Sequence, residues 1–117
     1  MTTMGAFLKA TRETLNEQTR NHSFRKIAAR IGVSAPYVMQ IENGTGSPPT
    51  EKTIVALAKD LNLDPDLVLA MGGKVSSELQ AIILKRPHLF AEIILACKDM
   101  PDQAILKIVR EVRDGEW

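Results

Sequence analysis

The sequence has little of what secreted and membrane proteins depend on. Cys97 is the one cysteine in 117 residues, which excludes an intrachain disulfide framework and any all-cysteine metal site and makes the cytoplasm the default compartment. No stretch approaches the roughly 18 uncharged apolar residues of a membrane-spanning helix. The first five residues carry no basic stretch followed by an apolar run, as a signal peptide would. We therefore expect a cytoplasmic protein that is neither secreted nor inserted in a membrane.

Residues that could form a catalytic or metal centre are also scarce. His22 and His88 lie far apart in the sequence, and neither has a ligand partner nearby. No residue stands out as a candidate for catalysis, and the sequence has no strand-rich segment that could build a self-cleaving serine–lysine domain. We therefore expect no enzyme activity, no metal and no cofactor.

Net charge is only +1, from 15 basic and 14 acidic residues, and this value neither requires nor excludes a nucleic-acid partner. The distribution is more informative. Residues 1–50 hold six basic and three acidic side chains, residues 51–73 hold two and four, and residues 74–117 hold seven of each. Attraction for an anionic polymer is therefore concentrated in the first half of the chain.

Apolar residues make up 44% of the chain, and they recur at helical rather than alternating spacing, so the sequence predicts an all-α fold without strands. Ser23, Ser34, Thr50 and Asp64 are placed to cap helices, and Asn21 can adopt the left-handed conformation that closes the first one. The expected helices run from about residue 3 to 19, 23 to 32, 34 to 43, 50 to 61, 64 to 71, 76 to 85, 87 to 98 and 101 to 113.

The clearest boundary in the chain is the pair Gly72-Gly73. It predicts a five-helix domain over residues 1–73 and a three-helix extension over residues 74–117.

Residues 24–44 have the spacing of two short helices joined by a tight turn. Such a unit needs a small residue where the helices cross and a residue tolerant of positive φ in the turn, and Ala28 and Gly32 meet these needs. Five apolar residues form a wedge toward the rest of the domain: Ile27, Ile31, Val33, Val38 and Ile41.

The opposite face of the second helix in this unit carries Ala35, Pro36, Met39 and Gln40. A helix fits the major groove of DNA, where glutamine can pair with adenine and small apolar groups can contact a thymine methyl. This face is therefore suited to reading bases.

The segment resembles the phage-repressor type of helix-turn-helix found in the Xre family of bacterial and phage transcriptional regulators. The resemblance rests on Ile-Gly-Val-Ser at 31–34 and Tyr-Val-Met-Gln-Ile-Glu-Asn-Gly at 37–44, and it covers roughly residues 5–73. It implies a double-stranded DNA partner. We expect base contacts from Ala35, Pro36, Met39 and Gln40, and DNA-backbone contacts from Phe24, Arg25, Lys26, Ser34, Tyr37 and Asn43.

The sequence departs from the family pattern at two places. Phe24 stands where many members have glutamine, and the loop over residues 45–49 has no charge where lysine or arginine is frequent. The phosphate contacts are therefore expected from Arg20, Arg25, Lys26 and Lys52.

The extension carries more aliphatic surface than three short helices can hide between themselves. Self-association is the economical explanation, and a two-fold axis would hold two recognition helices about 34 Å apart on an inverted-repeat operator. The alternative is that the extension packs onto its own N-terminal domain. The expected dimerisation residues are Leu89, Phe90, Ile93, Ile94, Ile105 and Val109.

The motif and the resemblance together predict a sequence-specific DNA-binding transcriptional regulator, a homodimeric repressor that occludes a promoter. Two alternatives stay open. The first is an antitoxin that autoregulates a toxin operon and has the toxin as a protein partner. The second, from a different class, is a protein-interaction adaptor that uses the helix-turn-helix fold to contact another protein.

Overall fold

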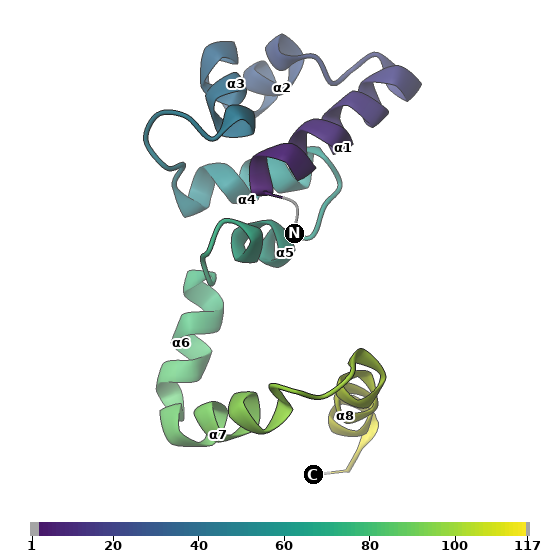
Figure 1. Ribbon diagram of the computed structural model, residues 1–117, viewed down its shortest axis with the longest axis vertical. Helices are drawn as coiled ribbons and strands as arrows, with labels where there is room; N and C mark the ends of the chain where they lie inside the picture. The colour runs from purple at the N-terminus through teal and green to yellow at the C-terminus, as the bar shows by residue number, and fades with distance from the viewer. Residues whose placement is uncertain (1–2, 117) are drawn as a thin grey trace. The chain divides into compact units, whose positions relative to one another are not determined.

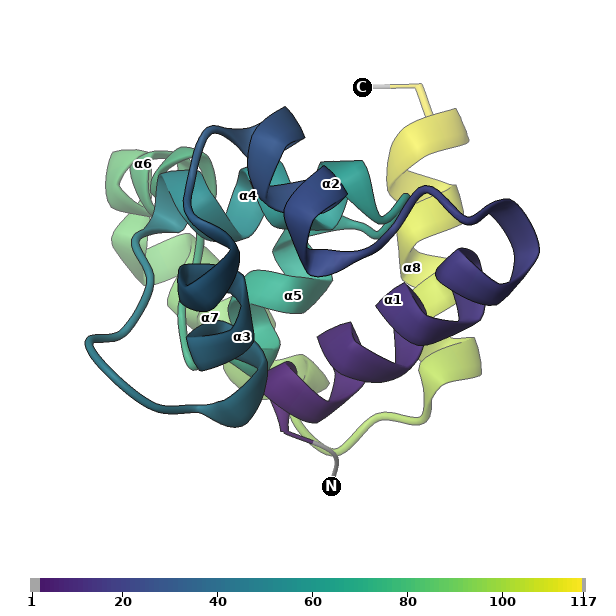
Figure 2. The same ribbon diagram turned by 90° about the horizontal axis from the view of Figure 1, so that it is seen from above.

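The computed structural model describes residues 3–116, and within this range it contains eight helices and no strand (Figures 1 and 2). The expectation of an all-helical fold is confirmed. None of the helices in this range is long and apolar enough to cross a membrane. The helices are α1 (Met4–Thr19), α2 (Phe24–Ile31), α3 (Ala35–Asn43), α4 (Glu51–Asp60), α5 (Pro65–Met71), α6 (Ser77–Lys85), α7 (Pro87–Cys97) and α8 (Asp102–Asp114).

Side-chain caps start the helices of the first half where the sequence predicts them. The Ser23 hydroxyl accepts a hydrogen bond from the Lys26 amide at 3.3 Å, and Ser34 accepts one from the Tyr37 amide at 3.2 Å. Thr50 and Asp64 act in the same way on α4 and α5. These oxygens satisfy amide groups that have no partner in the first turn of a helix, so the four predicted caps are confirmed.

Left-handed residues end the first three helices. Gly32 has φ 78° after α2, and Gly44 has φ 68° after α3. After α1 the left-handed residue is Arg20, with φ 62°, and not the expected Asn21. The reason is local, because the Arg20 amide donates to the Asn16 carbonyl at 2.9 Å, and the side chain of Asn16 then accepts from the His22 amide.

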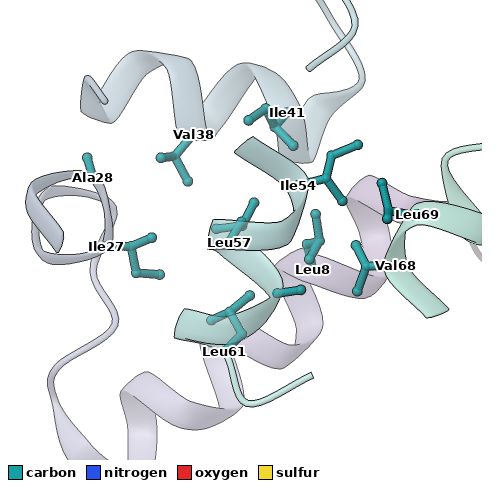
Figure 3. Packing of buried hydrophobic residues seen from close by; sticks show 11 residues of the cluster. Leu8, Ile27, Ala28, Val38, Ile41, Ile54, Leu57, Leu61, Val68 and Leu69 are labelled. Atoms are coloured by element: carbon teal, nitrogen blue, oxygen red, sulfur yellow. The ribbon is translucent and has the colours of Figure 1, made fainter. Parts of the chain in front are cut away.

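Residues up to 76 form one compact unit, and residues 77 onward form a second. The core of the first unit draws on all of its five helices. In Figure 3 the side chains of Ile54 and Leu57 from α4 lie between those of α2 and α3 on one side and those of α1 and α5 on the other, and Leu61 follows directly after α4. The buried apolar residues are Leu8, Ile27, Ala28, Val38, Ile41, Ile54, Leu57, Ala58, Leu61, Val68 and Leu69.

The second unit consists of α6, α7 and α8, and none of the residues in these helices is buried. Leu84 is 73% exposed, Leu95 69% and Leu89 59%. Large exposed apolar side chains occur on all three helices, among them Leu84 on α6, Leu95 on α7 and Leu106 on α8. Contiguous apolar surface of this kind is typical of interaction sites.

Candidate nucleic-acid interface

The two helices of the motif meet through a short turn. Ala28 is 3% exposed at their crossing, and its carbonyl accepts hydrogen bonds from the amides of both Gly32 and Val33, at 2.9 and 3.0 Å. The turn then leads to Ser34, which caps α3. The small side chain at 28 and the positive φ at 32, both predicted from the sequence, therefore produce the turn between the helices.

The wedge side of α3 faces the core, as expected, and the opposite side faces solvent. Val38 and Ile41 are buried, whereas Pro36, Met39 and Gln40 are exposed. Ala35 differs from its predicted position, since it is half-buried and packs against the core. Three of the four residues predicted to contact bases thus share the solvent-exposed face of α3.

The residues predicted to contact the DNA backbone divide into two groups. Arg25 and Lys26 are exposed in the first turn of α2, and Asn43 is exposed at the end of α3. The partial positive charge at a helix N-terminus adds to that of the two cations and favours an anion there. Tyr37 is half-buried, and Ser34 uses its hydroxyl oxygen to cap α3.

Phe24, also predicted to lie by the phosphate backbone, has a structural role. Its ring packs against the core, and the guanidinium of Arg12 lies over it at 3.9 Å from the ring centroid. The ring carries no hydrogen-bond donor, so the group at this position that can meet a phosphate is the backbone amide.

A buried ion pair below the interface was not predicted from the sequence. Arg12 Nε donates to Glu42 Oε2 at 2.6 Å, and Nη2 donates to Oε1 at 3.2 Å. The two side chains are 9% and 4% exposed. Arg12 is therefore removed from the set of cations that could meet DNA, and Glu42, although it belongs to the recognition helix, faces away from solvent.

Arg30 is neutralised in a similar way. Its Nε and Nη2 donate to the two carboxylate oxygens of Asp60 at 2.6 and 2.9 Å, which links α2 to α4. These hydrogen bonds raise the pKa of the Arg30 guanidinium above its ordinary value. Among residues 3–52, the exposed cations outside the ion pairs of Arg12 and Arg30 are therefore Lys9, Arg20, Arg25, Lys26 and Lys52.

Arg20 and Lys26 lie close together beside the start of α2. Lys26 Nζ donates to the backbone carbonyl of Arg20 at 2.6 Å. This contact fixes the ammonium group next to the Arg20 backbone without neutralising it, because a carbonyl oxygen carries no net charge. The positive charge around the motif is therefore gathered at the N-terminal end of α2.

The comparisons with known proteins agree with this geometry. The family model described as "Helix-turn-helix domain" matches residues 3–71 of the chain. No curated protein and no solved structure matches the chain. Since the family model spans well over half of the 117 residues, the chain belongs to the helix-turn-helix domain family of DNA-binding regulators.

Proposed function

We propose that the protein is a sequence-specific transcriptional repressor of the Xre type, which binds an inverted-repeat operator as a homodimer and occludes a promoter. One observation carries the proposal. The face of α3 opposite the core presents Pro36, Met39 and Gln40 to solvent, without a charged side chain among them. A helix face of this kind fits the major groove, and its glutamine offers both a donor and an acceptor to adenine.

The exposed cations set the expected strength of the phosphate contacts. Arg20, Arg25 and Lys26 lie at the N-terminal end of α2, and Lys52 lies in the first turn of α4. Four phosphate contacts per protomer would give a log–log salt slope of about −3 to −4 for each half-site. Binding is thus expected to depend on salt, and sequence preference has to come from α3.

The second unit supports the dimer. Four of the six predicted dimerisation residues are 47–59% exposed, namely Leu89, Ile93, Ile94 and Val109. The other two, Phe90 and Ile105, are less exposed and partly buried. A second copy of the same unit would cover this apolar surface under two-fold symmetry, which also matches the symmetry of an inverted repeat.

Fluorescence anisotropy provides the test. The full-length protein is titrated against DNA from upstream of its own reading frame and against a shuffled duplex, between roughly 50 and 200 mM salt. A preference of about a thousandfold for the native duplex, with a steep salt slope, is the expected result. Equal affinity for both duplexes that changes little with salt would contradict the proposal and favour a protein-interaction adaptor.

The same apolar surface favours a second candidate, an antitoxin that represses its own operon. A toxin would then bind the exposed aliphatic side chains of the second unit, in place of or in addition to a second copy. Co-expression with the product of the neighbouring reading frame, followed by gel filtration, separates the candidates, because a repressor without a toxin elutes unchanged.

A further inference from the structure

The loop that follows the recognition helix lies directly on the side chain of Gln40. At Gly46, a Cβ atom would lie 2.9 Å from Gln40 Oε1 and 3.5 Å from Gln40 Cδ. A residue with a Cβ atom at position 46 would therefore displace the Gln40 amide, whereas glycine leaves it in its observed position. Gly46 also has φ +76°, a conformation that glycine adopts without steric cost.

The loop is held over the helix by its own backbone. The Thr45 amide donates to the Gln40 carbonyl at 3.0 Å, and the Gly44 amide donates to the Ile41 carbonyl at 3.3 Å. These bonds, together with the positive φ of Gly44, turn the chain back along α3. Pro48 and Pro49 then restrict the far end of the loop, since a proline fixes its own φ and limits the residue before it.

A pocket of about 190 Å³ lies beside the loop. It is lined by Met4 of α1, by Gln40 and Ile41 of α3, and by residues 44–49 of the loop itself. Gln40 therefore has the loop on one side, although its side chain is exposed. An exposed glutamine otherwise samples many rotamers, and fixing them on binding costs free energy. A loop that fills one side of the side chain removes part of this freedom before DNA arrives.

We propose that Gly46 is a specificity-determining positioning residue, and that the loop over residues 44–49 holds the amide of Gln40 for reading one base pair. This inference rests on the proposed function, because it assumes that Gln40 contacts a base. Gly46 itself touches no base in this proposal and acts through Gln40.

The chain contains a matched control for the test. Gly44 belongs to the same loop and has φ +68°, but a Cβ atom there would meet nothing within 4 Å. Gly44→Ala and Gly46→Ala therefore introduce similar backbone strain, and they differ in the contact with Gln40. Gly46→Asn is a second variant at the same position, since asparagine tolerates positive φ better than alanine does.

The experiment uses the full-length protein and a pool of randomised DNA duplexes. The pool first yields the sequence that the parent prefers, and duplexes with each of the four base pairs at each position are then compared by fluorescence anisotropy. Gln40→Ala identifies the base pair that Gln40 reads, as the position where preference falls by roughly five- to 150-fold. Circular dichroism confirms that every variant compared is folded.

We expect Gly46→Ala and Gly46→Asn to lose most of the preference at that one base pair and to keep the parent's preferences elsewhere. Gly44→Ala should retain the preference at all positions. In a Gln40→Ala background, Gly46→Ala should change the preference no further. A purely structural defect would instead lower affinity for every duplex by the same factor.

The outcomes separate this inference from the proposed function. If Gln40→Ala relaxes one position while both Gly46 variants read DNA like Gly44→Ala, or lower affinity uniformly, the role of Gly46 is overturned and the DNA-reading role of α3 stands. If Gln40→Ala keeps every preference, Gln40 reads no base and the role of Gly46 falls with it. If the parent selects no sequence from the pool, the reading function assigned to α3 is itself wrong.

Discussion

Arg12 and Glu42 form a two-point ion pair inside the first unit, with nitrogen-to-oxygen distances of 2.6 and 3.2 Å. The pair joins α1 to the last turn of α3, and Phe24, the first residue of α2, lies beneath the guanidinium. The side chain of Arg12 therefore connects α1 to both helices of the helix-turn-helix, α2 and α3. This arrangement holds α3 from its buried side.

The first prediction concerns this pair. Glu42→Gln removes the buried counter-charge of the Arg12 guanidinium and leaves it the more distant, half-exposed carboxylate of Glu13, 3.9 Å from Nη2. Breaking a buried pair in this way costs about 3–5 kcal/mol. We expect a loss of this size in the free energy of unfolding of the full-length protein, measured by urea denaturation.

Asp60→Asn is the control for that measurement. It breaks the Arg30–Asp60 pair, in which the arginine side chain is 40% exposed, so the expected loss is smaller, about 1 kcal/mol or less. Equal effects of the two substitutions would show that burial of the Arg12–Glu42 pair does not matter for stability.

The second prediction concerns Gly5, which packs against the end of α3. A Cβ atom at Gly5 would lie 2.8 Å from the Ile41 carbonyl oxygen and closer still to that of Glu42. Both are backbone atoms and cannot rotate away. Gly5→Ala is therefore expected to destabilise the protein by about 1–3 kcal/mol, although alanine is the better helix former. The sign of the change in a urea unfolding experiment decides between packing and propensity.

The helices of the first unit could be predicted because their signals are local. Capping oxygens at Ser23 and Ser34 act on amides three residues away, and Gly32 sets its own φ. The apolar spacing around Ile27 and Val38 follows the helical period, so it also identifies the buried face. Each of these predictions needs no information about which helices pack together.

The ion pairs could not be predicted in the same way. Arg12 and Glu42 are 30 residues apart, as are Arg30 and Asp60, and a charged residue on a helix carries no sign of whether its partner lies across the core. Arg12 and Arg30 therefore belong to the positive charge of residues 1–50 in the sequence, although both are paired with carboxylates in the fold. The role of Phe24 was hidden for the same reason, because its partner Arg12 lies on another helix.

The contact between Gly46 and Gln40 could not be predicted from the sequence either. A glycine in a segment rich in Gly, Ser and Pro is typical of any exposed turn, and nothing in the sequence shows that its Cα faces the side chain of Gln40. The contact depends on how the backbone of residues 44–49 turns back over α3, which is a property of the folded chain.

The third prediction separates base reading from phosphate binding. Gln40→Ala removes an amide from the exposed face of α3 and is expected to relax preference at one base pair at a cost of about 1–3 kcal/mol. Arg25→Ala removes an exposed cation beside α2 and should weaken binding to all duplexes alike, with a salt slope shallower by about one unit. Anisotropy titrations at several salt concentrations measure both effects. Identical behaviour of the two variants would contradict the assignment of separate roles.

The fourth prediction concerns the second unit. Leu89 is 59% and Ile93 53% exposed, and they lie one helical turn apart on α7. If a second copy covers them, the double variant Leu89→Asp and Ile93→Asp places four carboxylates in the apolar interface of the dimer, where unpaired charges cost several kcal/mol. We expect sedimentation equilibrium of the full-length variant to show a monomer where the parent is a dimer.

Glu92→Gln on the same helix is the control for the dimer, because it changes an exposed polar residue without adding a charge. It should leave the dimer intact. A double variant that still dimerises with the parent's dissociation constant would place the interface outside the Leu89 and Ile93 surface. A monomeric variant that also loses most of its operator affinity, while keeping its helical circular dichroism, would show that DNA binding depends on pairing two recognition helices.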